Sequence, residues 1–259
     1  MKTYLTPLLI ILVLFTLNAQ KSISPIQPDR PGLGESSQVV PKKYLQIEMG
    51  GNLSIDAEGA DRLYEVAWNN TTLRYGLFEN FELRLAINLI QNYSILQGVK
   101  ENSPLGFSPW SFGCKAKITE QKGAIPRTSL LGYIAIPYPS ASFLKTSFIA
   151  PSILVPMEWD LTDQLLFTVN TGVFWNGEDA IPDYFASIGL DYALPKNWGV
   201  FIEAYMNLDE NALFLPGANA GVIWRVLPNL QFDLSAGIGL NKLMADAFIN
   251  GGISYRFPN

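Results

Sequence analysis

The sequence contains no histidine and a single cysteine, Cys114, among its 259 residues. Histidine is the usual base for a serine nucleophile and a common metal ligand, so both kinds of site lack their main component. One cysteine forms neither an intrachain disulfide nor a cysteine-based metal cluster. Paired carboxylates remain for glycoside-type chemistry, but no pair stands out at a cleft-like spacing. We therefore expect a protein that is not an enzyme and has no cofactor and no metal site.

Basic residues are also scarce in this chain. The 18 Lys and Arg residues face 23 Asp and Glu residues, which gives a formal net charge of −5. Nucleic-acid binding requires a basic face that neutralises phosphates. The composition therefore argues against a nucleic-acid partner.

Long apolar runs are missing after the first twenty residues, so no later segment has the length of a transmembrane helix. The one early run, Leu8 to Leu17, follows Lys2 and is too short to span a bilayer. It predicts a signal peptide over residues 1–19, cleaved after Ala19, and hence export from the cytoplasm. A polar segment, residues 20–43, then precedes a strand-rich region over residues 44–257.

Apolar and polar residues alternate along most of the sequence. The composition is 48% hydrophobic and 12% aromatic. In the run from Phe81 to Tyr93, Leu83 and Leu85 oppose Glu82 and Arg84, a separation that a strand achieves and a helix does not. Similar runs cover residues 45–55, 64–77, 110–119, 128–136, 148–159, 165–175, 184–194, 198–208, 218–226, 230–240 and 245–257. Runs 128–136 and 148–159 are apolar on both faces, which leaves their orientation open. The pattern predicts an all-β fold: a transmembrane antiparallel up-and-down β-barrel of about 12 strands.

The connections between these runs alternate in length. Tight turns lie at residues 78–80, 162–164, 195–197 and 228–229, and longer stretches lie at 92–108, 138–146 and 176–183. Short periplasmic turns and longer extracellular loops are typical of outer-membrane barrels. This phase places both ends of the barrel region on the periplasmic side.

The last run, residues 245–257, has the form of a closing barrel strand. Ile249, Ile253 and Tyr255 share one face, and Gly251 and Gly252 divide the strand into two halves. A final strand that ends in aromatic residues is typical of outer-membrane barrels. We therefore expect location in the outer membrane of a Gram-negative-type bacterium, contact with outer-membrane lipid, and recognition of this strand by the outer-membrane insertion machinery.

Short motifs along the chain resemble one family of outer-membrane proteins. Asp29-Arg30-Pro31-Gly32 followed by Glu35-Ser36-Ser37 resembles the start of the mature chain in the family called "putative MetA-pathway of phenol degradation". The similarity continues in order with residues 73–77, 82–84, 113–115, 170–172, 203–205 and 231–233. The resemblance implies a small barrel that is proposed to pass hydrophobic or aromatic compounds. It does not identify phenol as a substrate.

Charged residues on the polar face of the strands are the candidates for a site. They are Glu48, Arg74, Glu82, Arg84, Lys115, Lys117, Glu203, Arg225, Asp233 and Arg256. One interpretation is a charged constriction that filters small-molecule solutes. The other is structural, because opposite charges inside a small barrel can pair and fill its interior. Arg74, Glu82 and Arg84 flank one tight turn and are expected to form a stabilising cluster at the periplasmic end.

The polar segment before the first strand, residues 20–43, has two interpretations. It either folds into the lumen as a plug, with Asp29 and Arg30 pairing to barrel charges, or forms a flexible periplasmic tail. The resemblance favours the plug.

Three functional hypotheses follow. The chain is a passive channel or transporter for small solutes, hydrophobic or aromatic ones among them, or a closed structural or surface-binding barrel without transport. The third is a soluble β-sandwich or lipocalin-like protein, which would have to bury its outward apolar rows against a second sheet.

Overall fold

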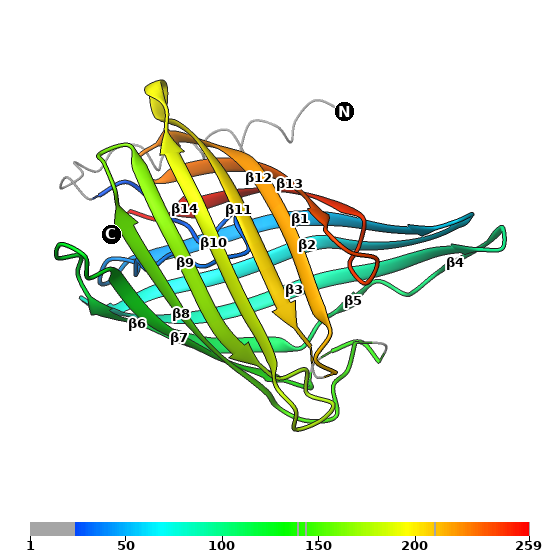
Figure 1. Ribbon diagram of the computed structural model, residues 1–259. Helices are drawn as coiled ribbons and strands as arrows, with labels where there is room; N and C mark the ends of the chain where they lie inside the picture. Colours follow the sequence, from blue (N-terminus) through cyan, green and yellow to red (C-terminus); the bar gives the residue numbers. More distant parts are fainter. Residues whose placement is uncertain (1–23, 139, 143, 210, 259) are drawn as a thin grey trace, which may run out of the picture.

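Figure 1 shows the computed structural model of the chain, in which residues 24–138, 140–142, 144–209 and 211–258 are described. The signal peptide predicted for residues 1–19, with its cleavage point, lies outside the described residues.

Twelve strands in the described residues form one closed antiparallel barrel. In chain order they are β1 (Leu45–Glu58), β2 (Asp61–Phe78), β3 (Phe81–Leu96), β6 (Trp110–Thr119), β7 (Arg127–Ile136), β8 (Ala150–Asp160), β9 (Leu165–Phe174), β10 (Asp183–Ala193), β11 (Trp198–Leu208), β12 (Phe214–Leu227), β13 (Leu230–Gly239) and β14 (Ala247–Arg256). Each strand pairs with the next in this series, and β14 pairs with β1 to close the barrel. The predicted all-β, antiparallel, up-and-down barrel is confirmed.

The predicted loop over residues 92–108 is wrong in its bounds. Strand β3 continues to Leu96, and two further short strands, β4 (Val99–Asn102) and β5 (Gly106–Phe107), pair back onto it. The reason is a tight turn at Gln97 and Gly98, which both adopt positive φ (51° and 80°), the conformation that suits a two-residue hairpin. This hairpin and the β1–β2 hairpin project beyond the barrel at the end that carries the longer loops (Figure 1).

The strands sort their side chains as the alternation predicts. Along β11, Val200 and Ile202 point outward and are exposed, whereas Phe201 and Glu203 point inward and are buried. Cys114 is exposed on the outward face of β6. In the described residues the outward apolar rows are not covered by a second sheet, which argues against the soluble sandwich. A continuous outward apolar band around a closed barrel is the surface that faces lipid.

Both ends of the barrel region lie at the same end of the molecule. Gln46 near the start of β1 pairs in register with Arg256 at the end of β14. The turns between β2 and β3 and between β12 and β13 lie at this end, which we call the short-turn end. Within the described residues, no helix has the length and apolar character needed to cross a membrane.

Candidate functional site

Residues 24–43, called here the N-terminal segment, run inside the barrel lumen. The segment is tied to the short-turn end at both of its ends, where the Ile26 amide donates to the Pro228 carbonyl at 2.7 Å and the Lys43 amide to the Gly76 carbonyl at 2.6 Å. Between these points Ser37 and Val40 are almost completely buried. The lumen at this end is therefore occupied by the chain itself.

Four glutamates of the barrel wall hold the backbone of this segment. Each carboxylate accepts at least one hydrogen bond from a backbone amide of the segment. The amide of Asp29 donates to Glu48 (3.0 Å), those of Leu33 and Gly34 to Glu203 (both 2.8 Å), that of Ser37 to Glu158 (2.9 Å) and that of Val40 to Glu82 (2.6 Å). An irregular buried segment has no ladder to satisfy its amides, so it needs such acceptors. Because the glutamates come from β1, β11, β8 and β3, they fix the segment from several sides of the wall.

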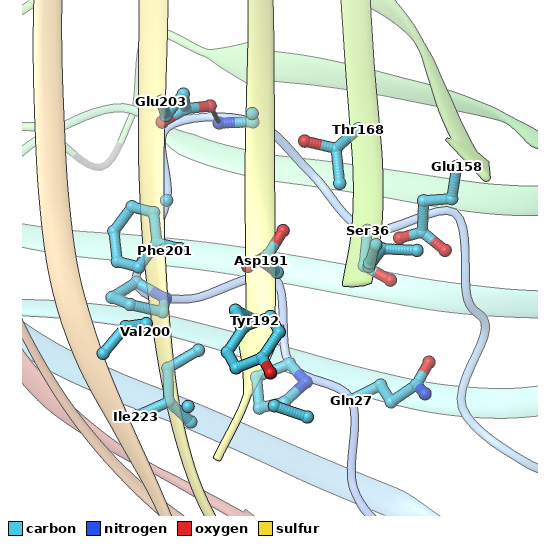
Figure 2. Close-up of a pocket in the computed structure, with 18 of the residues that line it drawn as sticks. Gln27, Ser36, Glu158, Thr168, Asp191, Tyr192, Val200, Phe201, Glu203 and Ile223 are labelled. Atoms are coloured by element: carbon cyan, nitrogen blue, oxygen red, sulfur yellow. Dashed lines mark hydrogen bonds between the residues drawn. The ribbon is translucent and has the colours of Figure 1, made fainter. Parts of the chain in front are cut away.

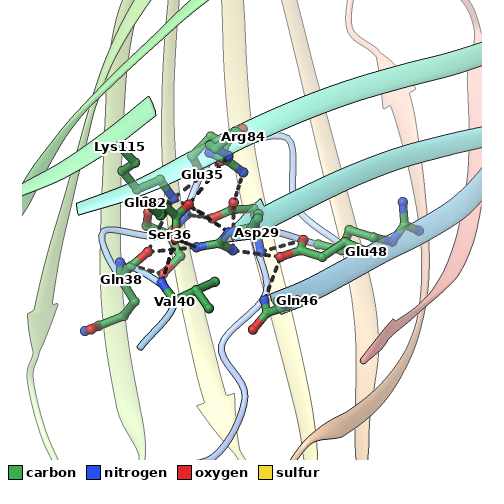
Figure 3. Close-up of polar contacts among 12 residues, drawn as sticks. Asp29, Glu35, Ser36, Gln38, Val40, Gln46, Glu48, Glu82, Arg84 and Lys115 are labelled. Carbon is green, nitrogen blue, oxygen red and sulfur yellow. Dashed lines mark hydrogen bonds and ion pairs between the residues drawn. The ribbon is translucent and has the colours of Figure 1, made fainter. Parts of the chain in front are cut away.

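Asp29 is the centre of a buried cluster of charges (Figure 3). Its carboxylate lies 2.9 Å from Arg74 Nη1 and 2.9 Å from Lys115 Nζ, and it also pairs with Arg84. Arg74 further contacts Glu48 at 2.7 Å and Glu82 at 2.9 Å. Breaking a buried pair by removing one partner costs about 3–5 kcal/mol, because the other charge is left uncompensated. The cluster therefore joins the segment to β1, β2, β3 and β6.

Glu35 lies at the edge of this cluster and is the acid with the weaker set of partners. Its carboxylate contacts Arg84 at 2.9 Å and Lys115 at 3.6 Å. Burial, together with the neighbouring Asp29, raises the pKa of Glu35 to about 6, although Arg84 opposes this. Burial would also raise the pKa of Asp29, but Arg74, Arg84 and Lys115 hold it well below its ordinary value. The cluster therefore has two charge states near neutral pH, which differ by one proton on the Glu35 carboxylate.

Arg30 forms a second attachment, to strands β13 and β14. Its guanidinium donates to Asp233 at 3.0 Å and to Asn250 at 2.8 Å. The group fits because Gly50 and Gly252 face each other across β1 and β14 and present no side chain beneath it. The glycines of the first and last strands therefore make room for Arg30.

The structure brings together only part of the predicted site residues. Glu48, Arg74, Glu82, Arg84 and Lys115 form the Asp29 cluster, whereas Glu203 and Asp233 hold other parts of the segment. Arg256 donates to the carbonyl of Ser24. Lys117 pairs with Glu120 at 2.7 Å near the short-turn end, and Arg225 lines a cavity.

Sequence reasoning missed several residues that contact the segment or line the lumen. Glu158 binds both the amide and the hydroxyl of Ser37 and also pairs with Arg127 at 3.1 Å. Asn170 accepts from the amide of Glu35 at 3.0 Å. The signal available was a single carboxylate in the otherwise apolar run 148–159, which would have fixed the inward face of that strand.

A cavity of about 250 Å³ lies between the N-terminal segment and the wall formed by β9 to β12 (Figure 2). Phe201 and Ile223 give it apolar surface, and Thr168, Asp191 and Arg225 give it polar groups. Residues of the tight turn at 162–164 also line it, so the cavity lies toward the short-turn end. A second cavity, of about 520 Å³, lies near the opposite end, between β1, β2, β3 and β4.

Comparisons with known proteins agree with this architecture. A family model described as "Putative MetA-pathway of phenol degradation" matches residues 28–257. The COG4313 outer membrane channel from Pseudomonas putida F1 is similar in structure, with a TM-score of 0.68 at 10% identity over 93% of this chain and 100% of that chain. The transport unit of the autotransporter AIDA-I from Escherichia coli (TM-score 0.55, 9% identity, 84% and 91% of the two chains) and the KdgM porin (0.52, 9%, 81% and 98%) are also similar. At these identities the likeness is one of fold. No curated protein matches the chain significantly.

Proposed function

Because this chain belongs to the family described as "Putative MetA-pathway of phenol degradation", we propose that it is a passive channel or transporter in the outer membrane of a Gram-negative-type bacterium. Its solutes are small, and hydrophobic or aromatic compounds are among them. The family relationship and the barrel fold support the general role, and the cavity beside the N-terminal segment supports the solute size.

The cavity is the observation that carries this proposal. Its volume of about 250 Å³ exceeds the roughly 150 Å³ that accommodates benzene in an engineered protein cavity. Its inner surface combines the ring of Phe201 and the side chain of Ile223 with a few polar groups, as small-molecule sites usually do. A space for one small aromatic molecule therefore exists between the segment and the wall.

Passage beyond this cavity requires the N-terminal segment to shift. The segment crosses the lumen and is held through Glu48, Glu82, Glu158 and Glu203. These contacts are polar and directional, so a displaced segment can return to the same place. We propose that movement of the segment controls passage.

The second candidate function is a closed structural barrel. The buried Asp29 cluster favours it, because paired charges that fill the interior of a small barrel need no transport role. Immobilising the segment distinguishes the two functions. A channel would lose its solute flux, whereas a closed barrel has no flux to lose.

A reversible tether tests the proposal. A side chain at Gly34 would place its Cβ 2.8 Å from Ser187 Oγ on β10, so Gly34→Cys with Ser187→Cys, in a Cys114→Ser background, is close enough for a disulfide. Proteoliposomes would report flux of benzenesulfonate and benzyltrimethylammonium, two aromatic ions that do not cross lipid unaided. We expect flux in the reduced protein and loss of flux on oxidation. The matched control is the Ser187→Cys, Cys114→Ser variant, whose flux oxidation leaves unchanged.

A barrel that passes neither ion in the reduced state would contradict the channel and support the closed structural barrel. Migration in detergent before and after heating confirms that each variant is folded, so loss of flux is not mistaken for loss of the barrel.

A further inference from the structure

Asp191 on β10 and Arg225 on β12 both line the 250 Å³ cavity, and both lack a direct partner there. They are close enough to interact electrostatically, yet neither forms a hydrogen bond or ion pair with any described residue. The Nε atom of Arg225 is buried and without a hydrogen-bond partner in the described part of the chain. Both side chains are partly buried, and two charges of opposite sign that face one cavity without a direct contact give it the convergent polar groups of a small-molecule site.

The surface between these two charges is apolar. Phe201 lies between β10 and β12 on β11 and is the register partner of Asp191, and Ile223 precedes Arg225 by two residues on the same face of β12. Figure 2 shows Asp191, Phe201 and Ile223 around the same space. Gly189 adds no side chain, and a Cβ there would come 2.7 Å from Thr168 Oγ1 and reduce the cavity. An anion site, a cation site and an apolar surface therefore face one small volume.

We propose that this cavity binds a small zwitterion with an apolar or aromatic body, of the size of an amino acid such as phenylalanine. The ligand ammonium pairs with Asp191, the ligand carboxylate pairs with Arg225, and the apolar body lies against Phe201 and Ile223. One ligand of this class satisfies both unpaired charges at once. A cation near the ring of Phe201 also gains cation–π attraction.

Ligands with one charge fit the same groups less well. A simple anion would pair with Arg225 but would be repelled by Asp191 and by the nearby carboxylates of Glu158 and Glu203. A simple cation would pair with Asp191 but would repel the partly buried Arg225 and leave it without a partner. Only a ligand that carries both charges avoids both costs.

This inference deepens the proposed function, on which its role in transport rests, but binding is measured without transport. Purified full-length protein in detergent is titrated calorimetrically with phenylalanine, phenethylamine and 3-phenylpropionate, which share the aromatic ring and differ in charge. We expect phenylalanine to bind at least about tenfold more tightly than either analogue, since each lost charge-assisted hydrogen bond corresponds to about that factor.

Two variants assign the charges. Asp191→Asn is expected to weaken phenylalanine binding about tenfold or more while sparing 3-phenylpropionate, and Arg225→Gln is expected to weaken phenylalanine and spare phenethylamine. Lys117→Gln is the matched control, because it also removes one lumen-side charge but at a residue paired with Glu120. It should bind phenylalanine as the unaltered protein does.

The proposal is overturned if phenylalanine does not bind, if the three ligands bind equally, or if the Asp191 and Arg225 variants bind phenylalanine normally. Heat-modifiable migration confirms that each variant remains folded. If phenylalanine does not bind but flux is still lost on oxidation of the tether, the zwitterion site is removed and the channel remains. Absence of flux in the reduced protein, with phenylalanine binding intact, removes the channel and leaves the site.

Discussion

The guanidinium of Arg30 occupies the space that a Cβ on Gly50 would fill. Gly50 lies on β1 opposite Gly252 on β14, so the pairing that closes the barrel also forms the recess that receives the N-terminal segment. From this recess Arg30 reaches Asp233 and Asn250. Barrel closure and attachment of the segment therefore depend on the same few residues.

Gly50→Ala should release Arg30 from its recess. The added methyl group overlaps the guanidinium, and the two hydrogen bonds to Asp233 and Asn250, each contributing about 1.5–3 kcal/mol, cannot form together with it. We expect a more frequently open channel, seen as more frequent current steps in planar bilayers. Gly251→Ala is the control, because a Cβ there would meet Leu234 Cδ1 at 3.4 Å and the Asp233 carbonyl oxygen at 3.6 Å, both ordinary contact distances. Equal currents in both variants would contradict the role of Arg30.

Asp29→Asn should loosen the segment more strongly. The substitution removes the carboxylate shared by Arg74, Arg84 and Lys115 and leaves buried positive charge uncompensated, at a cost of about 3–5 kcal/mol. We expect faster cleavage of the segment by a protease added on the side of the short turns. The pair of Lys117 and Glu120 supplies the control, since Glu120 is exposed and Glu120→Gln should cost no more than about 1 kcal/mol. A cleavage rate unchanged by Asp29→Asn would exclude the cluster as the main attachment.

Docking of the segment should weaken as pH rises through about 6. The docked segment raises the pKa of Glu35 from 4.5 to about 6, so it favours the protonated acid. Its contribution is therefore fully present below 4.5 and is lost as pH rises through 6, by at most about 2 kcal/mol. The lowered pKa of Asp29 acts in the opposite direction, but only below its ordinary value of 3.8.

Channel opening measured between pH 4.5 and 7.5 checks this dependence. We expect opening to increase across the range in the unaltered protein and to become flat in Glu35→Gln, whose neutral side chain imitates the protonated acid. A variant that retains the full pH dependence would show that another group is responsible.

Cys114 should lie in lipid when the barrel is in a membrane. Its side chain is exposed on the outward face of β6, beside outward-facing Phe112. A charged maleimide should therefore fail to label it in proteoliposomes and should label it after unfolding in denaturant. In a Cys114→Ser background, Ser147→Cys in the loop between β7 and β8 is the positive control. If the maleimide labelled Cys114 as fast as it labels the cysteine of Ser147→Cys, the outward face of β6 would not lie in lipid.

Local patterning was enough to place the wall of the barrel. The alternation in run 81–93 reflects a side-chain period of two, which any strand with one polar and one apolar face must show, and β3 indeed begins at Phe81. The same logic placed Glu82 and Arg84 inward. It failed at Gln97 and Gly98, where a tight turn extends the sheet, because turn residues carry no periodicity.

The local pattern of residues could not predict which side chains the inward charges contact. Asp29 and Lys115 are 86 positions apart, and Arg30 and Asp233 are 203 apart. Whether Glu203 filters solutes or holds a backbone depends on where residues 24–43 run, which no local pattern fixes.

Neighbouring residues are enough to predict the strands, the alternation of short turns with longer loops, and the inward and outward faces of all runs except 128–136 and 148–159. Three features require the folded chain: Asp29 joins Arg74, Arg84 and Lys115, Gly50 and Gly252 make room for Arg30, and Asp191 and Arg225 share a cavity. They require it because closure of the barrel brings distant strands around one lumen. There the burial of charge and the need to satisfy backbone amides select partners across space rather than along the chain.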